Sequence, residues 1–301
     1  MKRSRQAVTI AFIANLTIAV FKLVAAIFSR SASMLAEAYH SFSDTFNQVF
    51  LFIGIRQSKK KPDELHPFGY GKEQYFWSFL VAMLLFVVAG VLSVRNGYEK
   101  LFHAHPLEHI ALTYAALGLG FLMDGYSFSV AYKHIRRFMK REKIKSIFQA
   151  IRHSKNSVIL TVFFEDSLAL VGITIAATGI TLTHLTGNLV FDSIASIIIG
   201  IMLMIFAVLL AYEVKKLLIG EAMSRRKKNQ IREIVNSFKE VNRVIRLNTM
   251  HMSAEEALIV IEVNFKDNLT VPKLEKVINR ICAKVQEKIP KAQVIVEAED
   301  K

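Results

Sequence analysis

The stretch that decides the fold is SMLAEAYHSFSDTFNQVFLFIGI, residues 33–55, an apolar run interrupted by polar side chains. On a helix these positions lie at i, i+3, i+4, i+7 and i+10, so they share one face: Glu37, His40, Ser41, Asp44 and Asn47. Because ionisable groups are costly inside a membrane, this face is predicted to contact protein, an ion or water. An imidazole one turn from a carboxylate suits a metal ion or a proton. An ordinary interhelical hydrogen bond is the alternative.

The composition is that of a membrane protein with a water-soluble part. The chain has 301 residues, 52% of them hydrophobic, and a mean hydropathy of +0.34. Its net charge of +14 comes from basic residues beside apolar runs, without the aromatic interleaving of nucleic-acid binders, so no nucleic-acid partner is expected. The single cysteine, Cys282, supports neither a disulfide framework nor a thiolate metal cluster.

Six apolar runs each meet or approach the roughly 20 residues needed to cross a bilayer. They are residues 7–28, 33–55, 74–94, 109–131, 157–182 and 189–218. Lys and Arg gather at the N-terminus, in the second and fourth connections between the runs, and after the last run. The fourth connection includes Lys143 and Lys145. By the positive-inside rule this predicts a multi-pass protein with both termini in the cytoplasm. The cell membrane is the expected location, with an organelle membrane as the alternative.

The hydrophobic pattern changes after residue 220. Residues 231–238 and 274–285 have helical spacing, whereas 244–252, 259–265 and 293–297 are typical of strands. The sequence therefore predicts residues 1–220 as a transmembrane bundle of six helices and residues 221–301 as a small cytoplasmic α+β domain in the order α-β-β-α-β.

A second polar site lies in the fifth apolar run, where Glu165 and Asp166 are adjacent. Neighbours on a helix are about 100° apart, so both acids cannot face one direction and at least one needs a partner. A cation shared with His40 and Asp44 would have nitrogen and oxygen ligands suited to Zn²⁺, Mn²⁺ or Fe²⁺. Pairing of one acid with Lys22 is the alternative.

These residues carry a resemblance to a known family. The motifs SMLAEAYHSFSDTFNQ (33–48), HPFGYGKEQYFW (66–77), EDSLALVG (165–172) and DSIASIIIG (192–200) resemble those of the cation diffusion facilitator family. The resemblance implies metal and proton antiport by a homodimer, six transmembrane helices and a metallochaperone-like cytoplasmic domain. No resident cofactor is implied, because the divalent cation is the cargo.

The resemblance places transport ligands at His40, Asp44 and Asp166. Val162 occupies the position of the fourth ligand and cannot bind a metal, so Glu165 is the nearest substitute, as in a branch of the family with Glu-Asp here. Water, Asn47 or Asn15 could instead complete the shell. This oxygen-rich set leaves Zn²⁺ as the first choice, with Mn²⁺ or Fe²⁺ as alternatives.

Accessory sites of the family are altered. Asp63 and His66 match a loop pair, but Tyr70 replaces its second histidine, which predicts a weak site or a role for His66 in ordering the loop. In the C-terminal domain the corresponding strands offer glutamates, Glu262, Glu297 and Glu299, where zinc-binding members use histidines. Asp192, at the start of the last run, is expected to hydrate an exit or to cap its own helix.

The sequence thus predicts divalent cation efflux by cation/proton antiport with alternating access, carried out in the lipid bilayer by a homodimer. A transport-inactive membrane scaffold with the same fold is the alternative, because Val162 departs from the ligand pattern. An enzyme is not expected, since the chain has no His-Glu-x-x-His signature.

Overall fold

The computed structural model describes residues 2–103, 105–142 and 157–300, so Lys143 and Lys145 lie outside the described residues. The chain divides into two compact units. One comprises Met1–Val49 with Leu80–Leu210, and the other Phe50–Phe79 with Ala211–Lys301.

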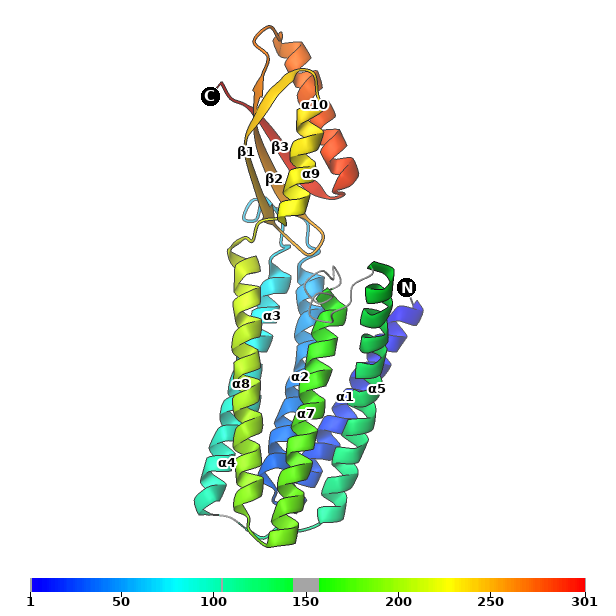
Figure 1. Ribbon diagram of the computed structural model, residues 1–301, viewed down its shortest axis with the longest axis vertical. Coiled ribbons are helices and arrows are strands. Elements are labelled where there is room, and N and C mark those ends of the chain that lie inside the picture. Colours follow the sequence, from blue (N-terminus) through cyan, green and yellow to red (C-terminus); the bar gives the residue numbers. More distant parts are fainter. Residues whose placement is uncertain (1, 104, 143–156, 301) are drawn as a thin grey trace. The chain divides into compact units, whose positions relative to one another are not determined.

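Long helices lying side by side build the first unit (Figure 1). Along the chain the helical elements are α1 (Lys2–Ser29), α2 (Ala32–Gln57), α3 (Glu73–Leu84), the π-helical η1 (Leu85–Val91), α4 (Leu92–Phe102), α5 (Ile110–Glu142), α7 (Ser157–Thr186) and α8 (Val190–Ile219). Helix α5 packs against both α1 and α7. The predicted helical membrane domain is confirmed.

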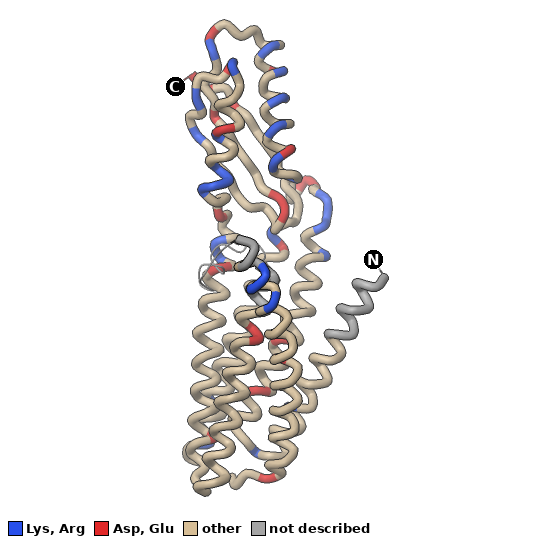
Figure 2. Tube along the Cα trace, turned by 45° about the vertical axis from the view of Figure 1, so that its right-hand side comes forward, with Lys and Arg blue, Asp and Glu red and all other residues tan. Residues whose placement is uncertain are grey.

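Four helical stretches in the described part of the chain are long and apolar enough to cross a membrane: Phe12–Ser29, Glu73–Phe102, Phe163–Thr186 and Val190–Ile219. The other two long helices, α2 and α5, carry more polar residues, including Glu37 and Asp44 in α2 and Asp124 in α5. Figure 2 shows acidic residues within the bundle. Six crossings therefore remain a prediction, in which α2 and α5 cross while shielded by their neighbours.

The helical stretch formed by α3, η1 and α4 packs very closely against α8. A Cβ atom on Gly90 would lie 2.3 Å from Cγ of Met204, and one on Gly200 would lie 2.8 Å from the carbonyl oxygen of Gly90. The hydroxyl of Ser196 donates to the carbonyl of Ser93 at 2.9 Å. Small residues thus let the two backbones meet, as is common between membrane helices.

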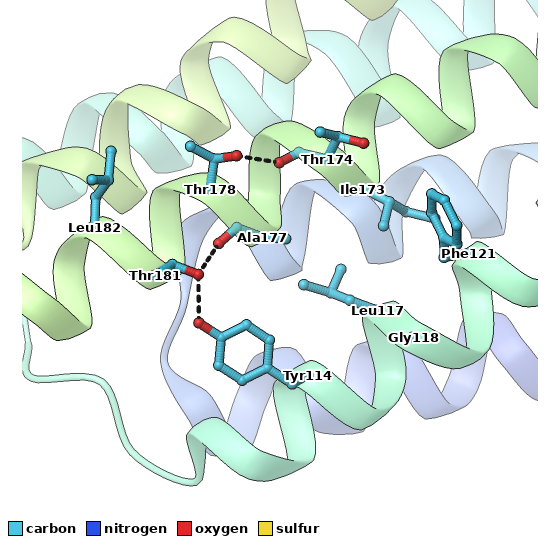
Figure 3. A pocket seen from close by; sticks show the side chains of 10 residues that line it. All are labelled: Tyr114, Leu117, Gly118, Phe121, Ile173, Thr174, Ala177, Thr178, Thr181 and Leu182. Atoms are coloured by element: carbon cyan, nitrogen blue, oxygen red, sulfur yellow. Dashed lines mark hydrogen bonds between the residues drawn. The ribbon is translucent and has the colours of Figure 1, made fainter.

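Helices α5 and α7 enclose an apolar groove of about 520 Å³ (Figure 3). The hydroxyl of Tyr114 lies 2.6 Å from that of Thr181, which donates to the carbonyl of Ala177 at 2.7 Å. The hydroxyl of Thr178 bonds in the same way to the carbonyl of Thr174 at 2.7 Å. These hydroxyls are satisfied within α7 or between α5 and α7, as a lipid environment requires, so the groove offers little to an ion.

Asp192, near the start of α8, bonds to the start of α2. Its carboxylate accepts from the backbone N–H groups of Ala32 (2.5 Å) and Ser33 (3.2 Å) and from the hydroxyls of Ser31 (2.7 Å) and Ser33 (2.5 Å). Its own N–H donates to the hydroxyl of Thr183 at 3.1 Å. The prediction that Asp192 caps its own helix was wrong, because its carboxylate caps α2, while a role in hydrating an exit stays a prediction.

In the second unit, two helices and a three-stranded sheet form a separate hydrophobic core. The elements are α9 (Arg225–Asn236), β1 (Val241–His251), β2 (Ala257–Phe265), α10 (Val271–Lys288) and β3 (Ala292–Ala298). Strand β2 is central, antiparallel to β1 and parallel to β3. Ile259 and Ile261 are fully buried in the same cluster as Ile231 of α9 and Ile281 of α10. The predicted order α-β-β-α-β is confirmed.

Replacing Asp192 with Ala should destabilise the start of α2. The loss of several buried hydrogen bonds to one cap is expected to cost about 2–4 kcal/mol. The measurements are the apparent melting temperature in detergent and hydrogen exchange at residues 31–33. Asn188→Ala is the matched control, because Asn188 accepts from the Val190 N–H at an exposed end of α8. Equal effects of the two variants would contradict the assignment.

Candidate cation site

The centre of the candidate site is the pair His40 and Asp44 on α2. Nε2 of His40 lies 3.6 Å from Oδ2 of Asp44, as expected one turn apart on a helix. The imidazole is only 4% exposed, and neither of its nitrogens has a hydrogen-bond partner in the described structure. Buried polar groups normally have hydrogen-bond partners. His40 departs from this rule in the described structure, so both of its ring nitrogens are free to bind a ligand inside the bundle.

The two adjacent acids of α7 point to different neighbours. Oε1 of Glu165 accepts from the side-chain amide of Asn47 on α2 at 2.9 Å. Asp166 instead lies beside Ser127 of α5, and its buried Oδ2 has no hydrogen-bond partner among the described residues. The divergence follows from the 100° between neighbours on a helix. Asn47, one of the predicted alternatives for the shell, thus contacts Glu165.

The four predicted ligands do not form one closed cluster in this arrangement. Within the part of the chain that the structure describes, no three His, Cys, Asp or Glu side chains lie close enough to hold one metal ion. His40 and Asp44 are together, while Glu165 and Asp166 are near enough for the charge of Asp44 to act on both. The side chain of Val162 lies outside the described residues.

A buried ion pair lies beside this site. Nζ of Lys22 on α1 is 3.0 Å from Oε2 of Glu37 on α2, with side-chain exposures of 1% and 0%. The alternative that Lys22 pairs with Glu165 or Asp166 was wrong for this arrangement. The sequence marked Glu37 as part of the polar face of α2, but nothing in the spacing identified its partner on α1.

In the second unit, the loop residues Asp63 and His66 do lie together. One oxygen of Asp63 accepts from the N–H of His66 at 2.7 Å, and the other accepts from the hydroxyl of Tyr70 at 2.6 Å. The Tyr70 bond and then the His66 N–H hold the pKa of Asp63 below its usual range. The ring of His66 packs on that of Tyr70 with centroids 4.2 Å apart. These contacts order the loop, and its metal binding remains a prediction.

The strand glutamates are engaged with other groups or exposed. Glu262 lies 3.4 Å from Nε of Arg246 and is paired in register with the exposed Glu297, while the N–H of Glu299 donates to the carbonyl of Val263. Regulatory metal binding there therefore gains no support from the geometry.

Comparison with known proteins gives two adjoining family matches. Residues 8–219 match the cation efflux transmembrane domain, and residues 223–301 match the cytoplasmic domain of cation efflux proteins.

The chain is also similar to individual proteins whose names state a role. The mitochondrial proton-coupled zinc antiporter SLC30A9 of Xenopus laevis is 32% identical over 81% of this chain and 44% of its own length. Metal tolerance protein C4 of Arabidopsis thaliana is 32% identical over 74% of this chain and 48% of its own. The manganese efflux system protein MneS of Bacillus subtilis is 23% identical over 54% of each chain.

The chain spans about half the length of these relatives, and its two matched domains account for nearly all of its own length. A transmembrane helical domain followed by a three-stranded α/β domain agrees with both matches. The motifs of α2, α7 and α8 all fall inside the first match. The chain therefore belongs to the cation efflux family, as the resemblance to cation diffusion facilitators predicted.

Proposed function

We propose that this protein exports divalent cations in exchange for protons, with Zn²⁺ as the first substrate and Mn²⁺ or Fe²⁺ as alternatives. The observation that carries the proposal is the buried imidazole of His40, whose two nitrogens lack partners beside the carboxylate of Asp44. A neutral imidazole next to a carboxylate is a ready ligand pair for a divalent cation. Relatives described as a zinc antiporter and a manganese efflux protein support both metals.

Proton exchange follows from the ligand chemistry. His40, Asp44, Asp166 and Glu165 can ligate a metal only after losing their protons. An empty, poorly solvated site does not keep several carboxylates charged side by side, so protons replace the departing metal. Binding of one ion therefore expels protons, and a proton gradient drives release.

Alternating access would complete the ligand shell. Because the acids of α7 stand apart from His40 and Asp44 here, α7 must move relative to α2 to bring Asp166 or Glu165 to the ion, or water must fill the gap. We place this cycle in a homodimer formed through residues 221–301, with six crossings of a cell membrane and both termini in the cytoplasm.

Asp44→Ala is expected to abolish transport, because it removes half of the ligand pair on α2. Zinc uptake into inverted proteoliposomes with an imposed pH gradient should fall by more than about 100-fold. This exceeds the loss expected when a residue that only orients a metal ligand is substituted. Glu287→Ala, which removes an exposed acid of α10, is the control and should transport normally. Normal uptake by the Asp44 variant would remove Asp44 from the transport site. No gradient-dependent uptake by the wild type would leave the transport-inactive scaffold as the better account.

Asn47→Ala should weaken metal binding through Glu165. Loss of the amide bond is expected to lower zinc affinity by about 10- to 100-fold, as for other groups that orient a ligand. Once Glu165 is Ala, adding Asn47→Ala should have little further effect, because the two residues act as one unit. Isothermal titration of the two single variants and the double variant measures this. Additive losses would separate Asn47 from Glu165.

Zinc binding should release protons and weaken as the pH falls. Each displaced proton makes the affinity fall by about tenfold per pH unit below the relevant pKa. Titration in weak buffer with a pH indicator counts the protons for wild type and for His40→Ala. An equal proton count in the two proteins would remove His40 from the exchange.

A further inference from the structure

The ion pair of Lys22 and Glu37 occupies a space made for it by two glycines. A Cβ atom on Gly120 of α5 would lie 2.8 Å from Cε of Lys22, and one on Gly172 of α7 would lie 2.4 Å from Oε1 of Glu37. Four helices, α1, α2, α5 and α7, thus meet around two charged side chains that are almost completely buried. Any larger residue at either glycine would displace the pair.

Packing alone does not account for this pair. A buried ion pair can often be replaced by apolar residues with no loss of stability, because desolvation offsets the attraction. Here hydrogen bonds do not fully compensate the cost of burying the charges, since Oε1 of Glu37 has no hydrogen-bond partner among the described residues. A pair that is costly and only half satisfied points to an electrostatic role.

The charges of the pair are close enough to act on the candidate cation site. Glu37 precedes His40 by three residues, which is about 4.5 Å along the helix axis. Besides Glu37, the acids whose charges act on Lys22 include Asp124 of α5 and Asp44 of α2. The charge of Lys22 acts in turn on His40 and Asp44, and in a medium of low dielectric a buried ammonium opposes a second cation.

We propose that Lys22 is a built-in counter-charge that limits the affinity of the site for divalent cations, and that Glu37 is the positioning residue that holds it there. This rests on the proposed transport function. The site gathers the negative charge of five acids, Glu37, Asp44, Asp124, Glu165 and Asp166, which without Lys22 would retain a divalent cation too tightly to release it. Lys22 offsets part of that negative charge without occupying the ligand positions.

The test compares zinc affinity and turnover in Lys22→Met, Glu37→Gln and the double variant. Lys22→Met leaves Glu37 as an added negative charge, so zinc should bind at least about tenfold more tightly and turnover should fall. Glu37→Gln leaves Lys22 uncompensated, so zinc should bind at least about tenfold more weakly. The double variant should lie between the two single variants.

Lys100→Met is the matched control. Lys100 lies on α4 and bonds to the carbonyl of Arg30, so the same substitution there should leave zinc affinity unchanged. If Lys22→Met does not fold, the double variant should still bind zinc more tightly than Glu37→Gln, because those two proteins differ only at Lys22. Unchanged or weaker binding on loss of the Lys22 charge overturns the proposal. A wild-type protein that binds no divalent cation would overturn the proposed function as well.

Discussion

The constraint on which the structure depends is that a charged group inside an apolar bundle needs a partner inside the protein. Glu37 has Lys22, Glu165 has Asn47, and Asp192 has the N-terminus of α2. His40 has no such partner for either ring nitrogen. The exception among these groups is therefore also the strongest candidate ligand, and it lies where a cation would satisfy it.

Small residues make these polar contacts possible. Gly120 and Gly172 leave space for the ion pair, while Gly90 and Gly200 bring η1 and α8 into backbone contact. The same absence of side chains serves two purposes, because close packing excludes lipid and also positions charged groups that a looser bundle would leave unpaired. Packing and electrostatics are thus set by the same few positions, and a change in one alters the other.

Periodicity was sufficient to predict the elements but not their contacts. The spacing of Ile259, Ile261 and Val263 identified a strand, and the polar face of α2 was visible because its residues recur every three or four positions. The pairing of Lys22 with Glu37 joins residues 15 apart on different helices, and Asp192 reaches back about 160 residues to Ala32. Such contacts depend on how helices pack, which local spacing does not encode.

The divergence of Glu165 and Asp166 links helix geometry to the proposed transport. Because neighbours are about 100° apart, one acid contacts α2 while the other contacts α5. A rotation of α7 that carries Asp166 toward His40 must carry Glu165 away from its present place beside Asn47. On the proposed function, the identity of the coordinating acid therefore changes with the rotation, so that metal coordination and helix movement are parts of one step.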